Sequence, residues 1–283
     1  MTSAAPTTMD ISSWTDALVR DDAGIWRTAA VHAVSYPEED NAVCFQIEDG
    51  SPWFRHRNDC LMSVVRRFPP AGPIVEIGAG NGYVARRFID EGFPSVVLEP
   101  GPTGAHNAKT KRQIDDVICA TLEDANFKAG VLAAVGLFDV LEHIEDDVAV
   151  VRQLGRILQP GGLVYLTVPS PPWLFSIKDV DAQHYRRYSI AQVTTLFGDA
   201  FHVEYATYFF SALTLPTLLL RAIPYRLGLA KPRSSESYAA EHARAGQSSS
   251  GVMGWFLGRE LRAVQAGRVR AHGTSCLLVA RRR

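Results

Sequence analysis

Short apolar runs alternate with amphipathic stretches through the middle of the chain. The runs 74–77, 94–100, 116–121, 132–139 and 163–168 are rich in Val, Ile and Leu, as buried parallel strands are. Between them, apolar residues recur at helical spacing. Strands that alternate with helices predict an α/β fold with a Rossmann-like, mostly parallel sheet flanked by helices.

Two more apolar runs, 201–209 and 275–281, predict the sixth and seventh strands of this sheet. Far more chain separates them than a hairpin needs, so an insert lies between them. The insert starts with an apolar part at 210–224 and continues with a polar part at 231–250, which is predicted to be mobile. A last helix is expected near 252–265. We expect the insert to act as a lid.

The chain before the first strand is predicted to be helical. Between residues 11 and 34 the apolar positions recur at roughly helical spacing, and 60–68 is amphipathic. These helices are expected to precede the core rather than belong to it. The predicted organisation is an N-terminal helical extension at 1–70, a core at 71–210, the insert at 211–273 and the final strand of the core at 274–283.

Composition and charge exclude several classes of function. The formal net charge is -1 and the mean hydropathy is -0.02, so the sequence predicts a soluble, globular protein without a basic face for nucleic acid. The four cysteines are scattered without a Cys-x-x-Cys pair, which argues against a disulfide framework and a zinc site and favours a reducing cytoplasm. Residues 1–10 lack the basic start and the apolar stretch of a signal peptide.

Three closely spaced glycines follow the first strand of the predicted core. Gly78, Gly80 and Gly82 let the backbone turn sharply and expose amide N–H groups at the start of the helix from Tyr83. A dinucleotide fingerprint needs its third glycine three residues after the second, where this chain has Tyr83. A pyrophosphate site is therefore disfavoured.

An acidic residue followed by Gly-x-Gly-x-Gly resembles motif I of the class I S-adenosylmethionine (SAM)-dependent methyltransferases, with Glu76 as the acid. Glu99, about twenty residues beyond the turn, ends the second strand where doubly wound folds place the acid that binds ribose hydroxyls. Asp139 ends the fourth strand and opens the segment to Asp146, which resembles motif IV. The three acids are expected on one carboxyl edge of the sheet. The resemblance implies a SAM-binding core of seven strands, one of the last two antiparallel.

The same resemblance implies further contacts with the cofactor. Trp53 and Arg57 match a Phe-Trp-Phe-x-x-Arg element that reaches over the methionine carboxylate of SAM, and Arg57 matches its arginine better than Arg55 does. By residue type alone, such a segment is more typical of a surface helix start. The family offers an acid to adenine after the third strand, where this chain has Ala120. The residues implied to contact SAM are Trp53, Arg57, Glu76, Gly78, Ala79, Gly80, Glu99, Pro100, Thr121, Leu122, Phe138, Asp139 and Val140.

A His-x-Arg-Arg-Tyr segment follows the fifth strand. It is similar to a segment of small-molecule methyltransferases, including those of the quinone-biosynthesis type. The resemblance implies a loop that overhangs the sulfonium end of the cofactor. Its arginines, Arg186 and Arg187, are expected to pin the loop through carboxylates such as Asp179.

Two histidines are candidate catalytic bases. An oxygen or carbon acceptor that must lose a proton needs a base, and His184 in the loop and His143 after the fourth strand are the candidates. Helix packing is the alternative role for His143. No paired carboxylates or histidine cluster appear at ligand spacing, so no metal is predicted. The sequence therefore predicts SAM-dependent methyl transfer to a small, fairly hydrophobic molecule.

Other functions stay open on the sequence alone. Methylation of a membrane- or protein-linked acceptor, and SAM binding without catalysis, are the alternatives. Segment 210–224 is too short and too interrupted by prolines to cross a bilayer, so it either lines the acceptor pocket, rests on a membrane surface or forms a homodimer contact. A nucleic-acid enzyme that acts on base amino groups is expected to have an Asn/Asp-Pro-Pro-Tyr/Phe motif, where this chain reads Asp-Val-Leu-Glu.

Overall fold

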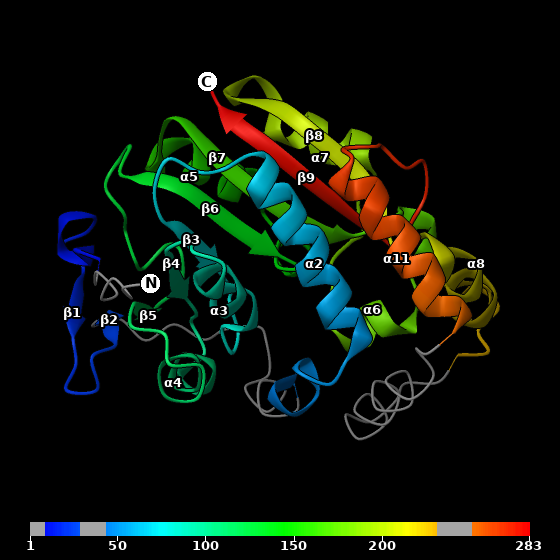
Figure 1. Cartoon of the computed structure of the whole chain (residues 1–283), viewed down its shortest axis with the longest axis horizontal. Coiled ribbons are helices and arrows are strands. Elements are labelled where there is room, and N and C mark those ends of the chain that lie inside the picture. The colour runs from blue at the N-terminus through cyan, green and yellow to red at the C-terminus, as the bar shows by residue number, and fades with distance from the viewer. Residues whose placement is uncertain (1–8, 29–43, 231–250) are drawn as a thin grey trace, which may run out of the picture.

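The computed structural model describes residues 9–28, 44–230 and 251–283. Its centre is one sheet with the strand order β1-β2-β5-β4-β3-β6-β7-β9-β8 (Figure 1). The strands from β2 across to β7 pair in parallel, while β9 is antiparallel to both of its neighbours and β1 is antiparallel to β2. The strands are β1 (Leu18–Arg20), β2 (Trp26–Thr28), β3 (Ile74–Ile77), β4 (Ser95–Leu98), β5 (Val117–Cys119), β6 (Leu132–Phe138), β7 (Leu158–Pro169), β8 (Phe201–Phe209) and β9 (Ser275–Arg282).

Helices cover both faces of the sheet, which makes the fold Rossmann-like (Figure 1). Helices α2 and α11 lie side by side on one face, and α5 and α7 lie on the other. The helices are α2 (Pro52–Arg67), α3 (Tyr83–Asp90), α4 (Pro102–Thr110), α5 (Asp147–Ile157), α6 (Ile177–Asp181), α7 (Ile190–Phe197), α8 (Thr214–Thr217), α9 (Ile223–Arg226) and α11 (Val252–Gln265). Between α8 and α9 the chain makes a π-helical turn, Leu218–Ala222.

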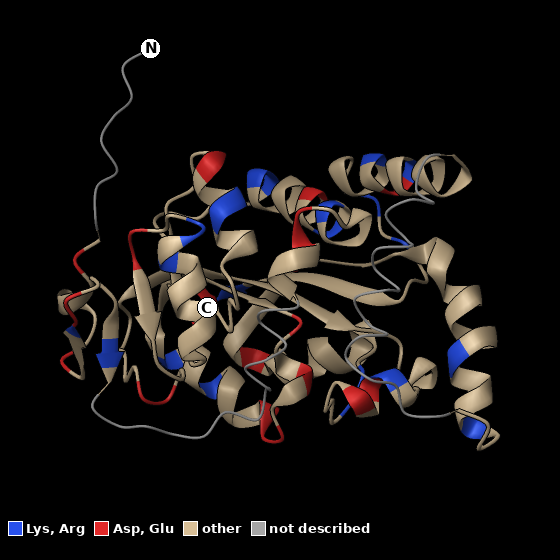
Figure 2. Cartoon of the chain, turned by 90° about the horizontal axis from the view of Figure 1, so that it is seen from below, with Lys and Arg blue, Asp and Glu red and all other residues tan. Residues whose placement is uncertain are grey.

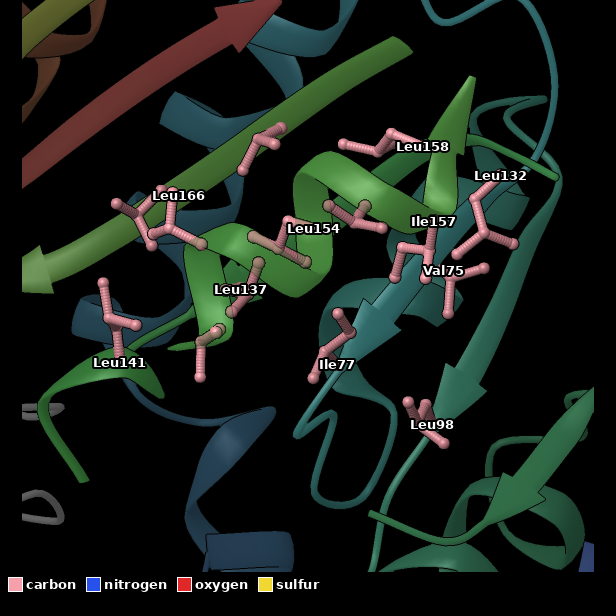
Figure 3. Close-up of a cluster of buried hydrophobic side chains, with 14 of the residues drawn as sticks. Val75, Ile77, Leu98, Leu132, Leu137, Leu141, Leu154, Ile157, Leu158 and Leu166 are labelled. Atoms are coloured by element: carbon pink, nitrogen blue, oxygen red, sulfur yellow. The ribbon is translucent and has the colours of Figure 1, made fainter. Parts of the chain in front are cut away.

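Alternate residues of β3 belong to two different hydrophobic cores. Val75 and Ile77 of β3 belong to the core under α5, where they meet Leu137 and Leu154 (Figure 3). Ile74 belongs to the core under α2 and α11. Since all four residues of β3 are buried, the strand is held from both faces, and the glycine turn that follows it has a fixed place.

The predicted strands of the core and the capped helix after Ser189 are confirmed. The helices predicted before the core are wrong over residues 11–28, which form a short 3₁₀ turn and the hairpin β1–β2. Leu18 and Ile25 are both buried, and a spacing of seven residues fits a hairpin as well as two helical turns. Gly24, with φ of +77°, makes the turn between the strands. Because β1 pairs with β2 and β2 pairs with β5, the sheet has nine strands within the described residues, where seven were predicted.

Most of the described part of the insert is helical, whereas residues 227–230 and 266–273 are not. Its apolar part forms α8, the π-helical turn and α9, and the predicted last helix is confirmed as α11. The polar part at 231–250, predicted to be mobile, lies outside the described residues. No helix within 9–28, 44–230 or 251–283 combines the length and the hydropathy that a membrane span requires.

Candidate active site

The turn after β3 presents backbone amides at the carboxyl edge of the sheet. Gly78, Gly80 and Gly82 have φ of +66°, +55° and +74°, a left-handed region that other residues disfavour. Gly78 donates its N–H to the carbonyl of Leu98 at 2.8 Å. A Cβ at Gly78 would lie 2.8 Å from Val140 Cγ2, so this position has no room for a side chain. Bare backbone therefore lines the turn.

Glu99, directly after β4, lies against this turn. Its Oε2 accepts the N–H of Gly80 at 2.7 Å, and its Oε1 accepts the N–H of Gly101 at 2.8 Å. These two backbone amides fix the orientation of the Glu99 carboxylate at the carboxyl edge of the sheet. Pro100 follows it, and its carbonyl accepts a weak hydrogen bond from Cys119 Sγ at 3.8 Å.

Two further acidic residues meet around one arginine. Glu76 is buried under the glycine turn, and burial raises the pKa of Glu76 to about 8 although the nearby Arg57 opposes the rise. Arg57 Nη1 donates to Asp139 Oδ2 at 2.5 Å. Asp139 has φ of +60°, which is uncommon for a residue other than glycine. Arg57 Nε is buried without a hydrogen-bond partner in the described part of the chain, so the guanidinium retains an unused donor.

Aromatic rings from two segments frame Arg57. The guanidinium carbon lies 4.9 Å from the ring centroid of Trp53 and 5.4 Å from that of Phe54. Trp53 also stacks on Phe210, with 5.3 Å between centroids and 4° between ring planes. Phe210 follows β8 directly and begins the insert. The predicted cofactor arginine is therefore connected to the root of the insert.

The fold brings a carboxylate and two histidines together. Glu142 and His143 lie in the 3₁₀ turn after β6, and the loop after α6 returns to it through the N–H of Tyr185, which donates to the Glu142 carbonyl at 2.8 Å. The ring centroids of His143 and His184 lie 4.7 Å apart. Glu142, His143 and His184 each have one potential ligand atom that lies within 4.8 Å of those of the other two. Spacing along the chain did not indicate this cluster, because His184 comes from a loop far from His143 in sequence, and the absence of a metal stays a prediction.

The protonation of this cluster follows from its burial. Burial, followed by the charge of Asp139, raises the pKa of Glu142 well above its usual range, and neither Glu142 oxygen has a hydrogen-bond partner in the part of the chain described. Burial, followed by His184, lowers the pKa of His143 to about 4. His184 Nδ1 lies 3.0 Å from Asp179 Oδ1, and if it donates there, Nε2 is left to face Glu142 at 3.9 Å. One oxygen and two nitrogen ligands suit a divalent transition-metal ion, and a histidine held by a carboxylate is typical of metal ligands.

The arginines of the loop are pinned by carboxylates, as predicted for them. Arg187 Nε donates to Asp179 Oδ1 at 2.6 Å. Arg186 pairs with a different carboxylate, Asp147, at 3.0 Å. The hydroxyl of Tyr188 donates to the same Asp147 at 2.8 Å. These bonds hold the loop against α5 and keep His184 beside Glu142.

The remaining predicted residues are distributed along the same edge. Thr121 and Leu122 follow β5, one strand farther from the glycine turn than Glu99. Thr121 Oγ1 donates to Asp124 within its own turn, and the Leu122 carbonyl accepts from Gln153 on α5. Phe138 is buried against Phe88, and Ala79 lies in the glycine turn with its N–H 3.3 Å from the Leu98 carbonyl.

A buried polar network behind the glycine turn was missed by the sequence analysis. Asn81 is 1% exposed, and its amide donates to Glu48 at 3.2 Å and accepts from Asn107 at 2.8 Å. Arg112 donates to the other oxygen of Glu48 at 3.0 Å. The one signal in the sequence is that Asn81 stands between two of the glycines. The network anchors the turn through the side chain of Asn81.

Comparison with known proteins identifies the family. A family model described as a methyltransferase domain matches residues 53–220, more than half of the chain. The chain belongs to the SAM-dependent methyltransferase family. SAM is the cofactor of this family, and the site fits it, since the glycine turn presents bare backbone, the Glu99 carboxylate is fixed beside that turn, and Arg57 Nε is a buried donor without a hydrogen-bond partner in the described part of the chain.

The methyltransferase has distant relatives among curated proteins. Over 134 residues it is 27% identical to the ubiquinone biosynthesis O-methyltransferase of Xanthomonas axonopodis pv. citri, which covers 45% of this chain and 56% of the relative. Over 156 residues it is 24% identical to a probable SAM-dependent methyltransferase of Mycobacterium tuberculosis, with 54% and 57% covered. The chain thus spans about half the length of the curated relatives it matches.

Solved structures share the fold of the methyltransferase. A chain from the Haloferax volcanii complex of the Trm112 activator with a methyltransferase has a TM-score of 0.57 at 17% identity, covering 88% of this chain and 99% of that one. Phosphoethanolamine N-methyltransferase 2 of Haemonchus contortus has a TM-score of 0.53 at 19% identity, covering 88% and 58%. At these identities the likeness concerns the fold alone.

Proposed function

We propose that this methyltransferase transfers the methyl group of SAM to a small, hydrophobic molecule that carries a hydroxyl group. The observation that supports the proposal is that Asp139 lies between the predicted cofactor residues and the Glu142–His143–His184 cluster. It contacts Arg57 on the cofactor side, and its charge acts on Glu142 and His143 on the other side. The two sets of residues therefore adjoin at one edge of the sheet, where a donor and an acceptor must meet.

The cofactor side of the site is assigned as follows. Glu99 accepts the two ribose hydroxyls of SAM, because its orientation is fixed by the amides of Gly80 and Gly101. Arg57 binds the methionine carboxylate, and its Nε is a donor that no other group among the described residues uses. SAM supplies an electrophilic methyl group on a positively charged sulfur. Trp53, Thr121, Leu122 and the residues around the glycine turn complete the pocket.

The protein's own work is to hold the acceptor in line with the methyl group, exclude water and take up a proton. His184 Nε2 is the atom assigned to the proton of the acceptor hydroxyl. Asp179, hydrogen-bonded to Nδ1, orients the ring and favours the tautomer with a lone pair on Nε2. His143, against the His184 ring, limits its movement.

A hydrophobic acceptor is favoured by the composition of the insert. Leu215, Leu219 and Leu220 are 61%, 52% and 75% exposed, and the stretch at the right of Figure 2 that carries them has basic residues but no acidic ones. The insert adjoins the loop after β7, where Phe175 packs on Tyr225 at 6.1 Å. The name of the Xanthomonas relative supports O-methylation. Membrane-surface and homodimer contacts through 210–224 are the competing roles of this face.

Calorimetry and turnover test the proposed function. The purified protein should bind SAM and S-adenosylhomocysteine, and it should methylate members of a panel of phenols and catechols with alkyl tails of increasing length. Turnover should improve with the tail. Failure to bind either cofactor form at millimolar concentration contradicts the proposal. Binding without turnover of any panel member contradicts the acceptor class and favours a SAM-binding module.

A second role for the Glu142–His143–His184 cluster is to bind a divalent cation. The observation that favours it is Glu142, whose buried carboxyl group has no hydrogen-bond partner in the described part of the chain. A dication would supply the missing partner and lower the pKa of an acceptor hydroxyl bound to it.

Chelation decides between a base and a cation. If the cluster binds a cation, dialysis against EDTA abolishes turnover and leaves S-adenosylhomocysteine affinity unchanged, and adding back Mn²⁺ or Zn²⁺ restores turnover. Glu142→Gln then stays inactive after the metal is added back, while Glu145→Gln, at an exposed neighbouring position, recovers turnover. Turnover that survives chelation assigns the cluster to proton transfer alone.

A further inference from the structure

Glu260 is a buried carboxylate that the proposed chemistry does not use. It lies on α11 and is 3% exposed. Its Oε2 accepts the N–H of Phe210 at 2.6 Å and lies 2.9 Å from His56 Nε2, and its Oε1 accepts the N–H of Ser211 at 2.9 Å. Arg270 Nε lies 3.5 Å from Oε1. Donors from α2, from the end of β8 and from the segment before β9 therefore converge on one side chain.

These donors keep Glu260 charged. Burial alone raises the pKa of this carboxyl, but hydrogen bonds from His56, Ser211 and Phe210 outweigh burial, and the pKa lies below its usual value. Charge-assisted hydrogen bonds are the strong ones, and a buried charge that loses a partner is costly. The carboxylate is consequently held in one geometry, and it holds its donors in turn.

The backbone that Glu260 holds is in an unfavourable conformation. Phe210 has φ of +57° and ψ of +41°, in the left-handed region. For a bulky residue this conformation is unfavourable and persists only where the surroundings impose it. Glu260 bonds to the N–H groups of Phe210 and Ser211 together, and Ser211 Oγ donates to the His272 carbonyl at 2.7 Å.

The strained turn points toward the cofactor arginine. Phe210 is 1% exposed, and its ring stacks on Trp53 and packs edge-on against His56 at 5.1 Å. Trp53 in turn lies against Arg57, which bonds to Asp139. Asp139 is itself in the left-handed region, with φ of +60°. The contacts thus run from one strained residue at the root of the insert to another at the centre of the site.

We propose that Glu260 is a positioning residue that couples the packing of the insert to cofactor affinity. By fixing the backbone at Phe210, it sets Trp53 against Arg57 in the orientation that binds the carboxylate of SAM. This inference rests on the proposed function, because it takes Arg57 as the residue that binds the methionine carboxylate of SAM. Coupling between two sites is reciprocal, so SAM also tightens the contact between α11 and α2.

The test is Glu260→Gln, which keeps the shape and removes the charge. S-adenosylhomocysteine affinity should fall about tenfold and the KM for SAM should rise by the same factor, while kcat at saturating SAM falls less. In an Arg57→Lys background the same substitution should have almost no further effect on affinity, because its route passes through Arg57. The matched control is Glu204→Gln, which removes another paired carboxylate, bonded to Arg281 at 2.6 Å on β8 and β9, and should leave affinity unchanged.

Phe210→Leu gives a second route to the same result if Glu260→Gln does not fold. It keeps the core apolar, removes the stack on Trp53 and should weaken affinity to a similar extent. Unchanged S-adenosylhomocysteine affinity in a folded Glu260→Gln or Phe210→Leu protein overturns the inference. The inference is also overturned if the losses of binding free energy caused by Glu260→Gln and Arg57→Lys are additive in the double variant. A wild-type protein that binds no S-adenosylhomocysteine contradicts the proposed function instead.

Discussion

The glycine turn and the root of the insert border the same site but are held by different means. At the turn, Gly80 bonds through its backbone to Glu99, 19 residues away. At the root, the side chains of His56 and Glu260 meet across 204 residues. The turn therefore depends on local backbone geometry, and the root depends on side chains that the complete fold brings together. Substitutions at the turn should act on cofactor binding directly, and substitutions at the root should act through other residues.

The largest effect on affinity is expected at Glu99. Glu99→Ala removes the acceptor of both ribose hydroxyls, each bond contributing on the order of 1.5–3 kcal/mol, and it also frees the Gly80 amide. S-adenosylhomocysteine affinity, measured by calorimetry, should fall accordingly, with the fold checked by circular dichroism. Intact affinity in a folded variant would show that Glu99 does not bind the ribose.

Gly78→Ala tests whether the turn depends on its backbone. The left-handed φ and the overlap with Val140 together should cost about 2–4 kcal/mol of unfolding free energy, and cofactor affinity should fall as the turn shifts. Gly92→Ala is the matched control, because Gly92 has φ of +86° but nothing within 4 Å of its Cβ position. It should cost about 1 kcal/mol in urea unfolding and leave affinity unchanged. Equal losses in the two variants would contradict the role given to Val140.

The third prediction compares Arg57→Ala with Arg55→Ala, because Arg57 lies where the glycine turn and the root of the insert meet. Arg57 is buried beside Asp139, whereas Arg55, on the same helix, is exposed. Loss of a charged bond to the carboxylate should raise the KM for SAM by the equivalent of about 1.5–3 kcal/mol in Arg57→Ala only. The reverse order in steady-state kinetics would assign the carboxylate to Arg55.

The smallest effect on the cofactor is expected from Leu219→Asp in the insert. Leu219 is 52% exposed. A charge at this position should weaken the binding of a hydrophobic acceptor by about 1 kcal/mol, which raises the KM for the acceptor roughly fivefold. S-adenosylhomocysteine binding should not change. Val19→Asp, at a 75% exposed position on β1, is the control. Unchanged turnover together with a changed sedimentation profile or liposome binding would assign this face to a subunit or membrane contact.

The sequence predicts the features that depend on residues close together in the chain. The core strands, the glycine turn and the carboxylates at strand ends follow from local patterns, as does the helix after Ser189, whose capping box pairs it with Gln192. The meeting of Glu142 with His184, and of His56 with Glu260, depends on loops and an insert whose paths no local pattern specifies. The hairpin at 18–28 differs from the predicted helix because Leu18 and Ile25, seven residues apart, fit two turns of a helix as well as two strands of a hairpin.

The position of β9 has a consequence for how the chain assembles. This strand comes after the insert in sequence, yet it lies between β7 and β8 and pairs with both. A nascent chain that has reached residue 274 exposes open edges on β7 and β8, which are sites for pairing with other chains. The sheet closes only after the ribosome has made the insert, so α11 and Glu260 are available when the last strand docks. A stop codon before residue 275 should therefore yield an aggregating product rather than a shortened enzyme.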